Sequence, residues 1–182
     1  MKDIVTERLI IRRIESSDWK DIHEYLSDEE VIRFEPYGVM TEEQVREETD
    51  KRVNHESFYA VVLKETMKII GNFYLDRGDF DTYELGYVFN RSYQKKGFAA
   101  EGAKAVIDYA FSELDARRVT AMCNPENEAS WKLLERLGFR REGHLHQNIY
   151  FKTDQNDEPI WLDTYEYAVL KSEWVQKKAQ QT

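Results

Sequence analysis

The sequence has few of the residues and segments that mark several common protein classes. It contains a single cysteine, Cys123, so no disulfide can form within the chain, and a reducing compartment such as the cytoplasm is expected. No run approaches the roughly 18 apolar residues of a membrane-spanning helix. The first residues, MKDIVTERL, lack the apolar region of a signal peptide. We therefore expect a cytoplasmic protein without a membrane partner.

Two common phosphate-binding motifs are also missing. The sequence has no GxxxxGK[ST] loop and no GxGxxG turn after a strand, which argues against nucleoside-triphosphate and dinucleotide sites. Positive charge is scarce overall, because 26 basic residues stand against 35 acidic ones and give a net charge of -9. Direct nucleic-acid binding depends on a broad cationic face and is not expected. An acidic chain suits a basic or amine-bearing substrate instead.

The residues that are present describe one ordinary globular domain. A length of 182 residues, 41% hydrophobic and 34% charged, is enough for a single core, so we expect residues 1–182 to form one domain. Strand patterns followed or flanked by helical periodicity predict a mixed, layered α/β fold. The polar end of the chain, 177–182, is expected to be frayed. Strands are expected at 9–14, 57–63, 68–75, 83–89, 118–122, 144–151 and 161–169, and helices at 19–26, 41–54, 99–114 and 129–137.

The most informative stretch is residues 83–104, YELGYVFNRSYQKKGFAAEGAK. Residues 83–89 are aromatic and β-branched with a single glycine, as in a strand. Residues 90–92 break that pattern, and from Ala99 apolar residues recur at helical spacing. The stretch therefore predicts a strand, a short basic turn and the start of a helix.

This turn has the character of an anion site. The first N–H groups of a helix lack partners within the helix and carry partial positive charge. Gly97 allows close backbone approach to a phosphate, or a conformation that other residues avoid. Between residues 91 and 104 there are four cations and one anion, so the segment is net +3 within a chain of net charge -9. From these residues alone, a solvated basic turn is an equally good interpretation.

The same residues resemble a known family. Gln94-x-x-Gly97-x-Ala99 matches the Q/R-x-x-G-x-G/A signature of the GCN5-related N-acetyltransferases (GNAT), whose loop holds the pyrophosphate of acetyl-coenzyme A. The segments TERLIIRR, SDW, ELGY and LGF are similar, in order and spacing, to the branch that contains the ribosomal-protein N-terminal acetyltransferases RimJ and RimL. The resemblance runs over about 6–174, the expected core of the domain.

The resemblance implies a GNAT fold, with a mostly antiparallel, bent sheet whose two central strands splay apart between flanking helices. In that family the pantetheine arm of the cofactor lies in the splay and binds exposed backbone, much as an added strand would. The implied cofactor-binding residues are Tyr87, Val88 and Phe89 on the strand, Gln94, Lys95, Lys96, Gly97, Phe98, Ala99 and Ala100 at the loop, and Asn127 and Ser130 at the next helix.

Acetyl transfer to an amine needs a polarised thioester carbonyl, a neutral amine and a proton for the departing thiolate. A backbone N–H near Val88 or Phe89 can polarise the carbonyl. Glu84 can accept the proton of the amine, and the resemblance places Ser130 near the thiol, where its hydroxyl can donate. Each has a structural interpretation as well, because Glu84 can be a surface carboxylate and Ser130 a helix cap.

Two departures from the family pattern bear on the chemistry. Many GNAT enzymes carry a tyrosine acid four residues after the position of Ser130, where this chain has Leu134. RimL-like sequences place an acidic residue in the strand after the Gly-Phe pair, where this chain offers histidines instead. A histidine can act as a base near neutral pH, so His146 is a third catalytic candidate, although a lone strand histidine is more often a surface residue. Asp163 matches a recurrent family aspartate of structural character.

Glu35 and Tyr37 lie in the loop where the family shapes its acceptor site, so they are candidate substrate-binding residues. The expected function is direct, metal-free acetyl transfer from acetyl-coenzyme A to a primary amine, of a protein N-terminus or a small molecule, in a ternary complex. The alternative is a non-catalytic acyl-coenzyme A sensor on the same fold. The sequence leaves open the acceptor, the acyl chain and the choice between monomer and homodimer.

Overall fold

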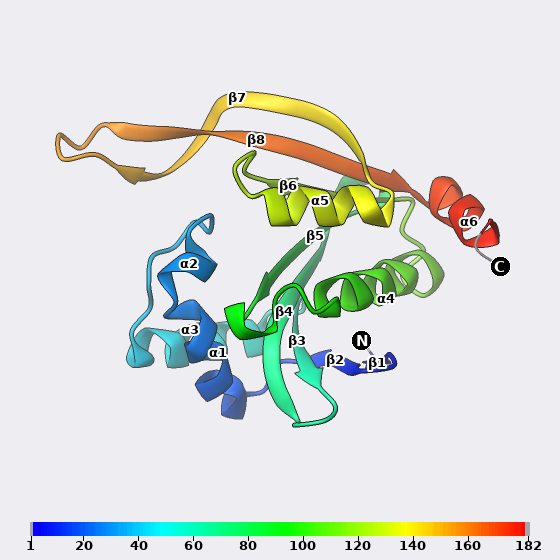
Figure 1. Cartoon of the computed structure of the whole chain (residues 1–182), viewed down its shortest axis with the longest axis horizontal. Helices are drawn as coiled ribbons and strands as arrows, with labels where there is room; N and C mark the ends of the chain where they lie inside the picture. The colour runs from blue at the N-terminus through cyan, green and yellow to red at the C-terminus, as the bar shows by residue number, and fades with distance from the viewer. Residues whose placement is uncertain (1, 181–182) are drawn as a thin grey trace.

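The computed structural model describes residues 2–180 as a single eight-stranded sheet with helices on both faces (Figure 1). The strand order is β1-β2-β3-β4-β5-β6-β8-β7, and every neighbouring pair is antiparallel except β5 and β6. This confirms the predicted mixed α/β fold with a mostly antiparallel sheet. The strands are β1 (Ile4–Val5), β2 (Leu9–Arg13), β3 (Phe58–Leu63), β4 (Lys68–Arg77), β5 (Thr82–Phe89), β6 (Arg118–Cys123), β7 (Arg140–Thr153) and β8 (Pro159–Leu170).

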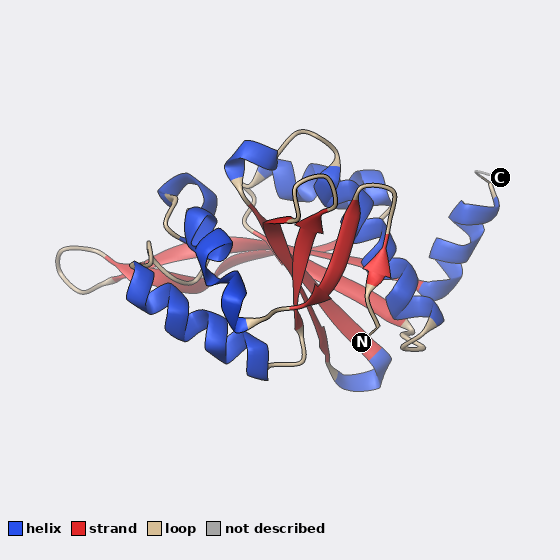
Figure 2. Ribbon diagram, turned by 90° about the horizontal axis from the view of Figure 1, so that it is seen from below, coloured by secondary structure: helices blue, strands red, loops and turns tan. Residues whose placement is uncertain are grey.

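The helices fall into two groups, one on each face of the sheet (Figures 1 and 2). One group is α1 (Trp19–Leu26), α2 (Glu29–Ile32) and α3 (Glu42–Asn54); the other is α4 (Phe98–Ser112), α5 (Glu128–Leu137) and α6 (Lys171–Ala179). Each group covers its own buried apolar cluster. The first cluster includes Ile22, Tyr25, Leu26, Val45, Val62, Ile69 and Val88, and the second includes Phe73, Leu85, Phe89, Val106, Ile107, Leu134 and Trp174.

The alternation of side chains along β5 links these two cores. Tyr83, Leu85 and Phe89 point toward α4 and α5, whereas Val88 points toward the α1–α3 group. Glu84 shares the parity of Val88, so its side chain leaves the strand on the α1–α3 face. The central strand therefore presents different chemistry to the two faces of the sheet.

The two central strands separate, as the resemblance implied. β4 and β5 pair along their whole length, from Arg77↔Tyr83 to Gly71↔Phe89. β5 and β6, in contrast, pair only from Thr82↔Arg118 to Glu84↔Thr120. Within residues 2–180, no strand pairs with that side of β5 from Leu85 onward, so the backbone groups that face this side can meet an extended ligand.

The end of the chain differs from the prediction of a frayed tail. Lys177 and its neighbours up to Ala179 belong to α6, while residues 181–182 lie outside the described part of the chain. α6 is held by Trp174, which is 5% exposed and donates its indole N–H to Asp108 Oδ1 at 2.6 Å. A buried aromatic with a satisfied N–H stabilises the last turns of a polar helix that composition alone does not predict.

Among residues 2–180, no helix has the length and apolar character needed to cross a membrane.

Candidate active site

The loop between β5 and α4 has the backbone geometry of an anion-binding turn. Gly97 is the N-cap residue of α4 and has a φ of +84°, in the left-handed region that favours glycine. The first N–H groups of α4 are thereby left free to face a ligand. Gln94 ties this loop to the strand, because its Nε2 donates to the carbonyl oxygen of Phe89 at 2.9 Å. The signature glutamine thus fixes the shape of the turn.

Arg8, immediately before β2, supports this loop and was not predicted. Its Nε pairs with Glu101 Oε2 at 2.6 Å, its Nη1 donates to the carbonyl of Lys96 at 3.1 Å, and its guanidinium stacks over Phe98 at 4.4 Å. Burial of Glu101 opposes ionisation, but hydrogen bonds from Thr6 and Arg8 outweigh it and hold the pKa of Glu101 below its ordinary value. The first turn of α4 is therefore anchored to β2.

Strand alternation decides which backbone groups of β5 face the splay. The N–H of Asn90 donates to Ile70 of β4, so the groups of Val88, two residues earlier, also face β4. Those of Tyr87 and Phe89 then face the open side toward β6. Of the three predicted strand residues, Tyr87 directs its backbone groups and Phe89 its N–H into the splay, whereas the carbonyl of Phe89 is bound by Gln94 and the groups of Val88 are taken up by the β4 ladder.

The start of α5 meets β5 through side chains. Asn127 is the N-cap of α5, and its Oδ1 accepts the backbone N–H of Ser130 at 3.2 Å. The hydroxyl of Ser130 lies 3.0 Å from the phenol oxygen of Tyr87. Burial raises the pKa of Tyr87, so the phenol stays protonated. The structure thus brings Ser130 and Tyr87 together beside the splay, while Leu134 is buried in the core.

Cys123 lies at the end of β6, next to this pair. Burial raises the pKa of the Cys123 thiol to about 11, against the opposing effect of a hydrogen bond with Ser130. A protonated, half-buried thiol is a weak nucleophile. Cys123 therefore serves packing rather than covalent catalysis.

Glu84 lies on β5 where the pairing with β6 ends, opposite Asp76 of β4. The side chain of Glu84 is exposed, yet the neighbouring protein atoms remove part of its hydration and raise its pKa, and the negative charge of Asp76 adds to this effect. A carboxylate with a raised pKa is a better proton acceptor near neutral pH than an ordinary one. Its position at the apex of the splay, on the α1–α3 face, suits a base for an amine that enters from that face.

A buried polar network lies on the same α1–α3 face. Arg52 of α3 is 3% exposed, pairs with Glu48 Oε1 at 2.7 Å and donates to Asn72 Oδ1 at 3.3 Å. Asn72, which stands opposite Val88 in the ladder, also accepts the phenol O–H of Tyr25 at 3.0 Å. This network gives α3 a fixed position over the central strands.

The loop with Glu35 and Tyr37 borders this network. Burial raises the pKa of Glu35, against opposing effects of Tyr37 and Arg52, and burial also raises the pKa of Tyr37. The next residues of the loop form an open hollow with α3. Its lining consists of Tyr37, Gly38, Val39, Met40, Gln44, Glu47, Glu48 and Lys51.

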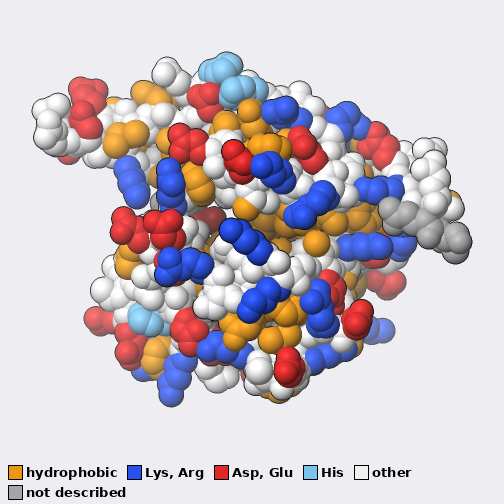
Figure 3. Space-filling model, in the orientation of Figure 1, with side chains coloured by type: hydrophobic (Ala, Val, Ile, Leu, Met, Phe, Trp, Pro, Cys, Tyr) orange, Lys and Arg blue, Asp and Glu red, His pale blue; other side chains and the backbone are white. Residues whose placement is uncertain are grey.

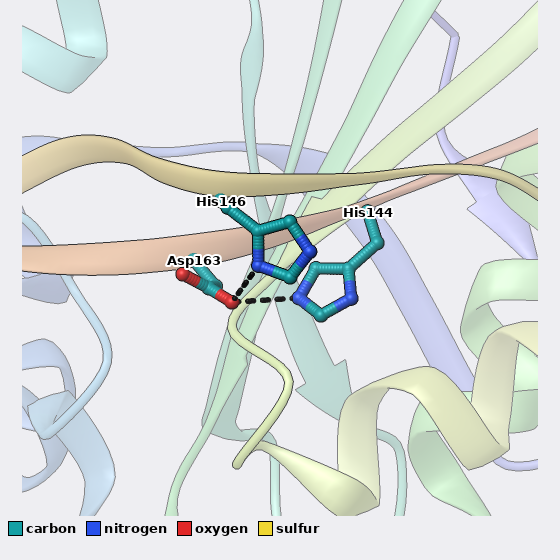
Figure 4. A group of neighbouring side chains, drawn as sticks. All are labelled: His144, His146 and Asp163. Carbon is teal, nitrogen blue, oxygen red and sulfur yellow. Dashed lines mark hydrogen bonds and ion pairs between the residues drawn. The ribbon is translucent and has the colours of Figure 1, made fainter.

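His146 lies apart from these residues. Its Nδ1 contacts Asp163 Oδ2 at 2.9 Å, and Nε2 of His144 contacts the same oxygen at 2.7 Å (Figure 4). β7 is the edge strand of the sheet and is separated from β5 by β8 and β6. Three strand spacings amount to roughly 14 Å, so Glu84 and His146 belong to different regions of the molecule.

A basic hollow lies between α4, α5 and α6, and sequence patterns did not point to it as a unit. Lysine and arginine side chains gather on this face of the molecule (Figure 3). The hollow unites residues from three helices, and the nearest signal in the sequence was the cationic stretch that ends at Lys104. Its lining consists of Lys104, Arg136, Leu137, Trp174, Lys177 and Lys178.

Comparison with known proteins agrees with this geometry. The sequence model of a family described as "Acetyltransferase (GNAT) domain" matches residues 8–140. The uncharacterised N-acetyltransferase YnaD of Bacillus subtilis is 41% identical over 94% of this chain and 98% of its own length. A crystal structure of a GNAT-family acetyltransferase from Bacillus anthracis is 38% identical, covers 94% of this chain and all of its own, and superimposes with a TM-score of 0.86.

A more distant relative has a named acceptor. The [ribosomal protein uS5]-alanine N-acetyltransferase of Escherichia coli is 28% identical over 94% of this chain and 92% of its own length. The family match covers well over half of the chain, and the YnaD relationship spans nearly all of it. This chain belongs to the GCN5-related N-acetyltransferase family, whose members transfer acetyl groups to amines.

Proposed function

We propose that the protein transfers an acetyl group directly from acetyl-coenzyme A to the N-terminal amine of a protein, in a ternary complex. The observation that carries this proposal is the open edge of β5, which leads straight to the glycine-capped start of α4. An extended pantetheine arm along Tyr87 and Phe89 would place its pyrophosphate at the N–H groups of residues 97–100.

The basic hollow suits the remaining charged group of the cofactor, the 3′-phosphate of its ribose. Lys104 lies six residues beyond the first residue of α4, roughly 9 Å along the helix from the pyrophosphate site. Arg136 of α5 and the lysines of α6 complete a cationic lining. We assign the 3′-phosphate to Lys104 and Arg136 because the rest of the cofactor occupies the neighbouring splay.

The transfer step needs three groups around the thioester. The neutral amine attacks the carbonyl carbon, Glu84 takes the proton that the nitrogen loses as the amide forms, and the N–H of Tyr87 or Phe89 stabilises the oxyanion. Collapse of the tetrahedral intermediate breaks the C–S bond, and the departing thiolate takes the hydroxyl proton of Ser130, which water restores, while the phenol of Tyr87 holds that hydroxyl in place. Glu84 and Tyr87 project to opposite faces of β5, so amine and thiol approach the carbonyl from opposite sides.

The acceptor side of the proposed active site favours the N-terminal end of a peptide chain. The hollow beside Tyr37 is open and carries Glu47, which suits a cationic amine with a segment of chain behind it, whereas Glu48 pairs with Arg52. The likeness to the uS5-alanine enzyme supports the same substrate class. A small-molecule amine is the competing outcome and is distinguished by assay.

The test is thermal unfolding with and without acetyl-coenzyme A, on the wild type and on Gly97→Glu. A ligand at ~100 times its dissociation constant stabilises the folded chain by roughly 2.7 kcal/mol, so the wild type should shift clearly. Gly97→Glu should show no shift, because a side chain at φ +84° strains the turn and its charge repels phosphate. Since the variant itself loses stability, the ligand-induced shift is compared rather than the melting temperature.

The matched control is Gly78→Glu, on an exposed turn with ordinary backbone angles, which should keep the full shift. Absence of a shift in the wild type overturns the cofactor site. Thiol release with peptides that carry free N-termini, but not with blocked ones, establishes the enzyme. A cofactor-induced shift without turnover on any amine would instead establish the acyl-coenzyme A sensor.

A further inference from the structure

The edge hairpin carries a cluster that the acetyl transfer described above does not use. His144 and His146 of β7 and Asp163 of β8 direct three donor atoms toward one point (Figure 4). These atoms lie within 4.8 Å of one another, and the two imidazole rings are 4.0 Å apart between centroids. The side chains are 37%, 72% and 31% exposed, so an ion from solvent can reach them.

A local irregularity of the hairpin creates this convergence. Leu145 pairs with Thr164 and Ile149 with Leu162, so three residues of β7 oppose the single residue Asp163. Gln147, in the bulge, has a φ of +46° and turns its N–H toward Asp163 Oδ1 at 2.9 Å. The bulge interrupts the ladder and aims side chains of β7 across it.

The contact with Gln147 also orients the carboxylate. One oxygen of Asp163 is held by the backbone, and the other is directed at both imidazoles. Hydrogen bonds from Gln147 and the histidines keep the pKa of Asp163 below its ordinary value, so the carboxylate is ionised at neutral pH. Metal-binding carboxylates are commonly fixed by such partners.

We propose that His144, His146 and Asp163 form a surface zinc-binding site that joins β7 to β8. Two imidazoles and one carboxylate are a common ligand set for Zn²⁺, with water in the fourth position. At metal–ligand distances of about 2.0–2.2 Å, tetrahedral donors lie roughly 3.3 Å apart. The 2.7 and 2.9 Å separations from Asp163 need to open by a few tenths of an ångström, and the two imidazole nitrogens, up to 4.8 Å apart, need to close by more than an ångström, movements that exposed side chains permit.

Zinc binding requires that the coordinating nitrogen of each imidazole carries no hydrogen. Nε2 of His144 and Nδ1 of His146 both face Asp163 Oδ2, and hydrogens on these nitrogens must leave before they bind a metal. Zn²⁺ takes their place, a neutral imidazole keeps its hydrogen on the other nitrogen, and an imidazolium releases one proton to solvent.

The experiment is calorimetric titration of the untagged chain with ZnCl₂ at neutral pH. One ion per chain is expected. Asp163→Asn and His146→Ala should each weaken binding by more than the roughly 10- to 100-fold that loss of a ligand's hydrogen-bond partner costs. Co²⁺ at the same site should give the visible absorption of a tetrahedral ion, a signal that disappears in both variants.

Two variants outside the cluster serve as controls. His23→Ala removes a histidine of α1, and Cys123→Ser removes the thiol, and both should bind zinc like the wild type. The proposal is overturned if the wild type binds no zinc. It is equally overturned if Asp163→Asn and His146→Ala bind as the wild type does, or if Cys123→Ser loses the ion.

Discussion

At the scale of single residues, several side chains of the family signature act on their own backbone. Gln94 closes the loop onto Phe89, and Asn127 caps α5 through the N–H of Ser130. These contacts position the first turn of α4 and the hydroxyl of Ser130 before any ligand arrives. Preorganised donors lower the reorganisation that binding and reaction would otherwise require.

Glu84 is expected to control the acid side of the pH–rate profile. Glu84→Gln should lower kcat by about 10²- to 10⁴-fold, the range of general-base catalysis. A base must be ionised, and the pKa of Glu84 is raised, so activity should be lost on acidification at a higher pH than for an ordinary glutamate. Steady-state rates as a function of pH provide the measurement.

Asp76→Asn tests the same assignment from a neighbouring residue. Removing the negative charge opposite Glu84 should lower the pKa of Glu84 and move the acid limb to lower pH, with the partial loss of hydration keeping part of the elevation. His146→Ala should leave the profile unchanged, because its imidazole is bound to Asp163 on the edge hairpin. An acid limb that vanishes in His146→Ala, and not in Glu84→Gln, would reverse the choice of base.

Ser130→Ala should separate catalysis from binding. Removal of the hydroxyl should lower kcat by about 100-fold, at the lower end of general-acid effects, since water can replace part of its role. The cap of α5 uses the backbone N–H of Ser130 and survives, so the thermal shift with acetyl-coenzyme A should persist. Ser112→Ala, at the end of α4, is the control. An unchanged kcat would reduce Ser130 to a structural residue.

At the scale of secondary-structure elements, α4 is the part that makes a cofactor site possible. Its first turn is held by Arg8, immediately before β2, and by the loop that Gln94 closes. Its side chains then continue toward α5 and α6, where Lys104 and Arg136 line one hollow. One helix thus presents N–H groups at its start and cationic side chains a turn and a half later.

Lys104→Glu should weaken the binding of acetyl-coenzyme A selectively. Loss of a charge-assisted contact to phosphate corresponds to about 10- to 100-fold in the dissociation constant. The 3′-dephospho form of the cofactor lacks the group that Lys104 contacts, so its binding should change little. Lys152→Glu, on the exposed edge strand β7, controls for net charge. Equal weakening of both cofactors would place Lys104 at another part of the ligand.

At the scale of the whole molecule, the gap between β5 and β6 lies between the two faces of the sheet. Pairing of β5 with β6 stops at Glu84, so cofactor and acceptor can reach the same gap from the two faces. The α1–α3 group closes one face with the Arg52 network, and α4 and α5 close the other. Such an arrangement is compatible with the proposed direct transfer in a ternary complex.

The sequence by itself determined the parts that depend on neighbours in the chain. Residues 82–89 alternate as a strand, α4 shows helical periodicity, and Gly97 adopts the positive φ that its position in the motif suggested. These features arise from short-range sterics and hydrogen bonding, which local composition encodes. The prediction that the two central strands splay apart came from the family resemblance, whose motifs extend over most of the chain.

Only the tertiary structure decided which distant groups meet. Tyr87 reaches Ser130 across 43 positions, and Arg52 reaches Asn72 across 20. The prediction of a frayed tail was wrong for Lys177–Ala179 because Trp174 is buried against α4. The His144–His146–Asp163 cluster exists because a bulge sets the register of β7 against β8. Register and docking are fixed by cooperative packing of segments far apart in the chain, which no local pattern contains.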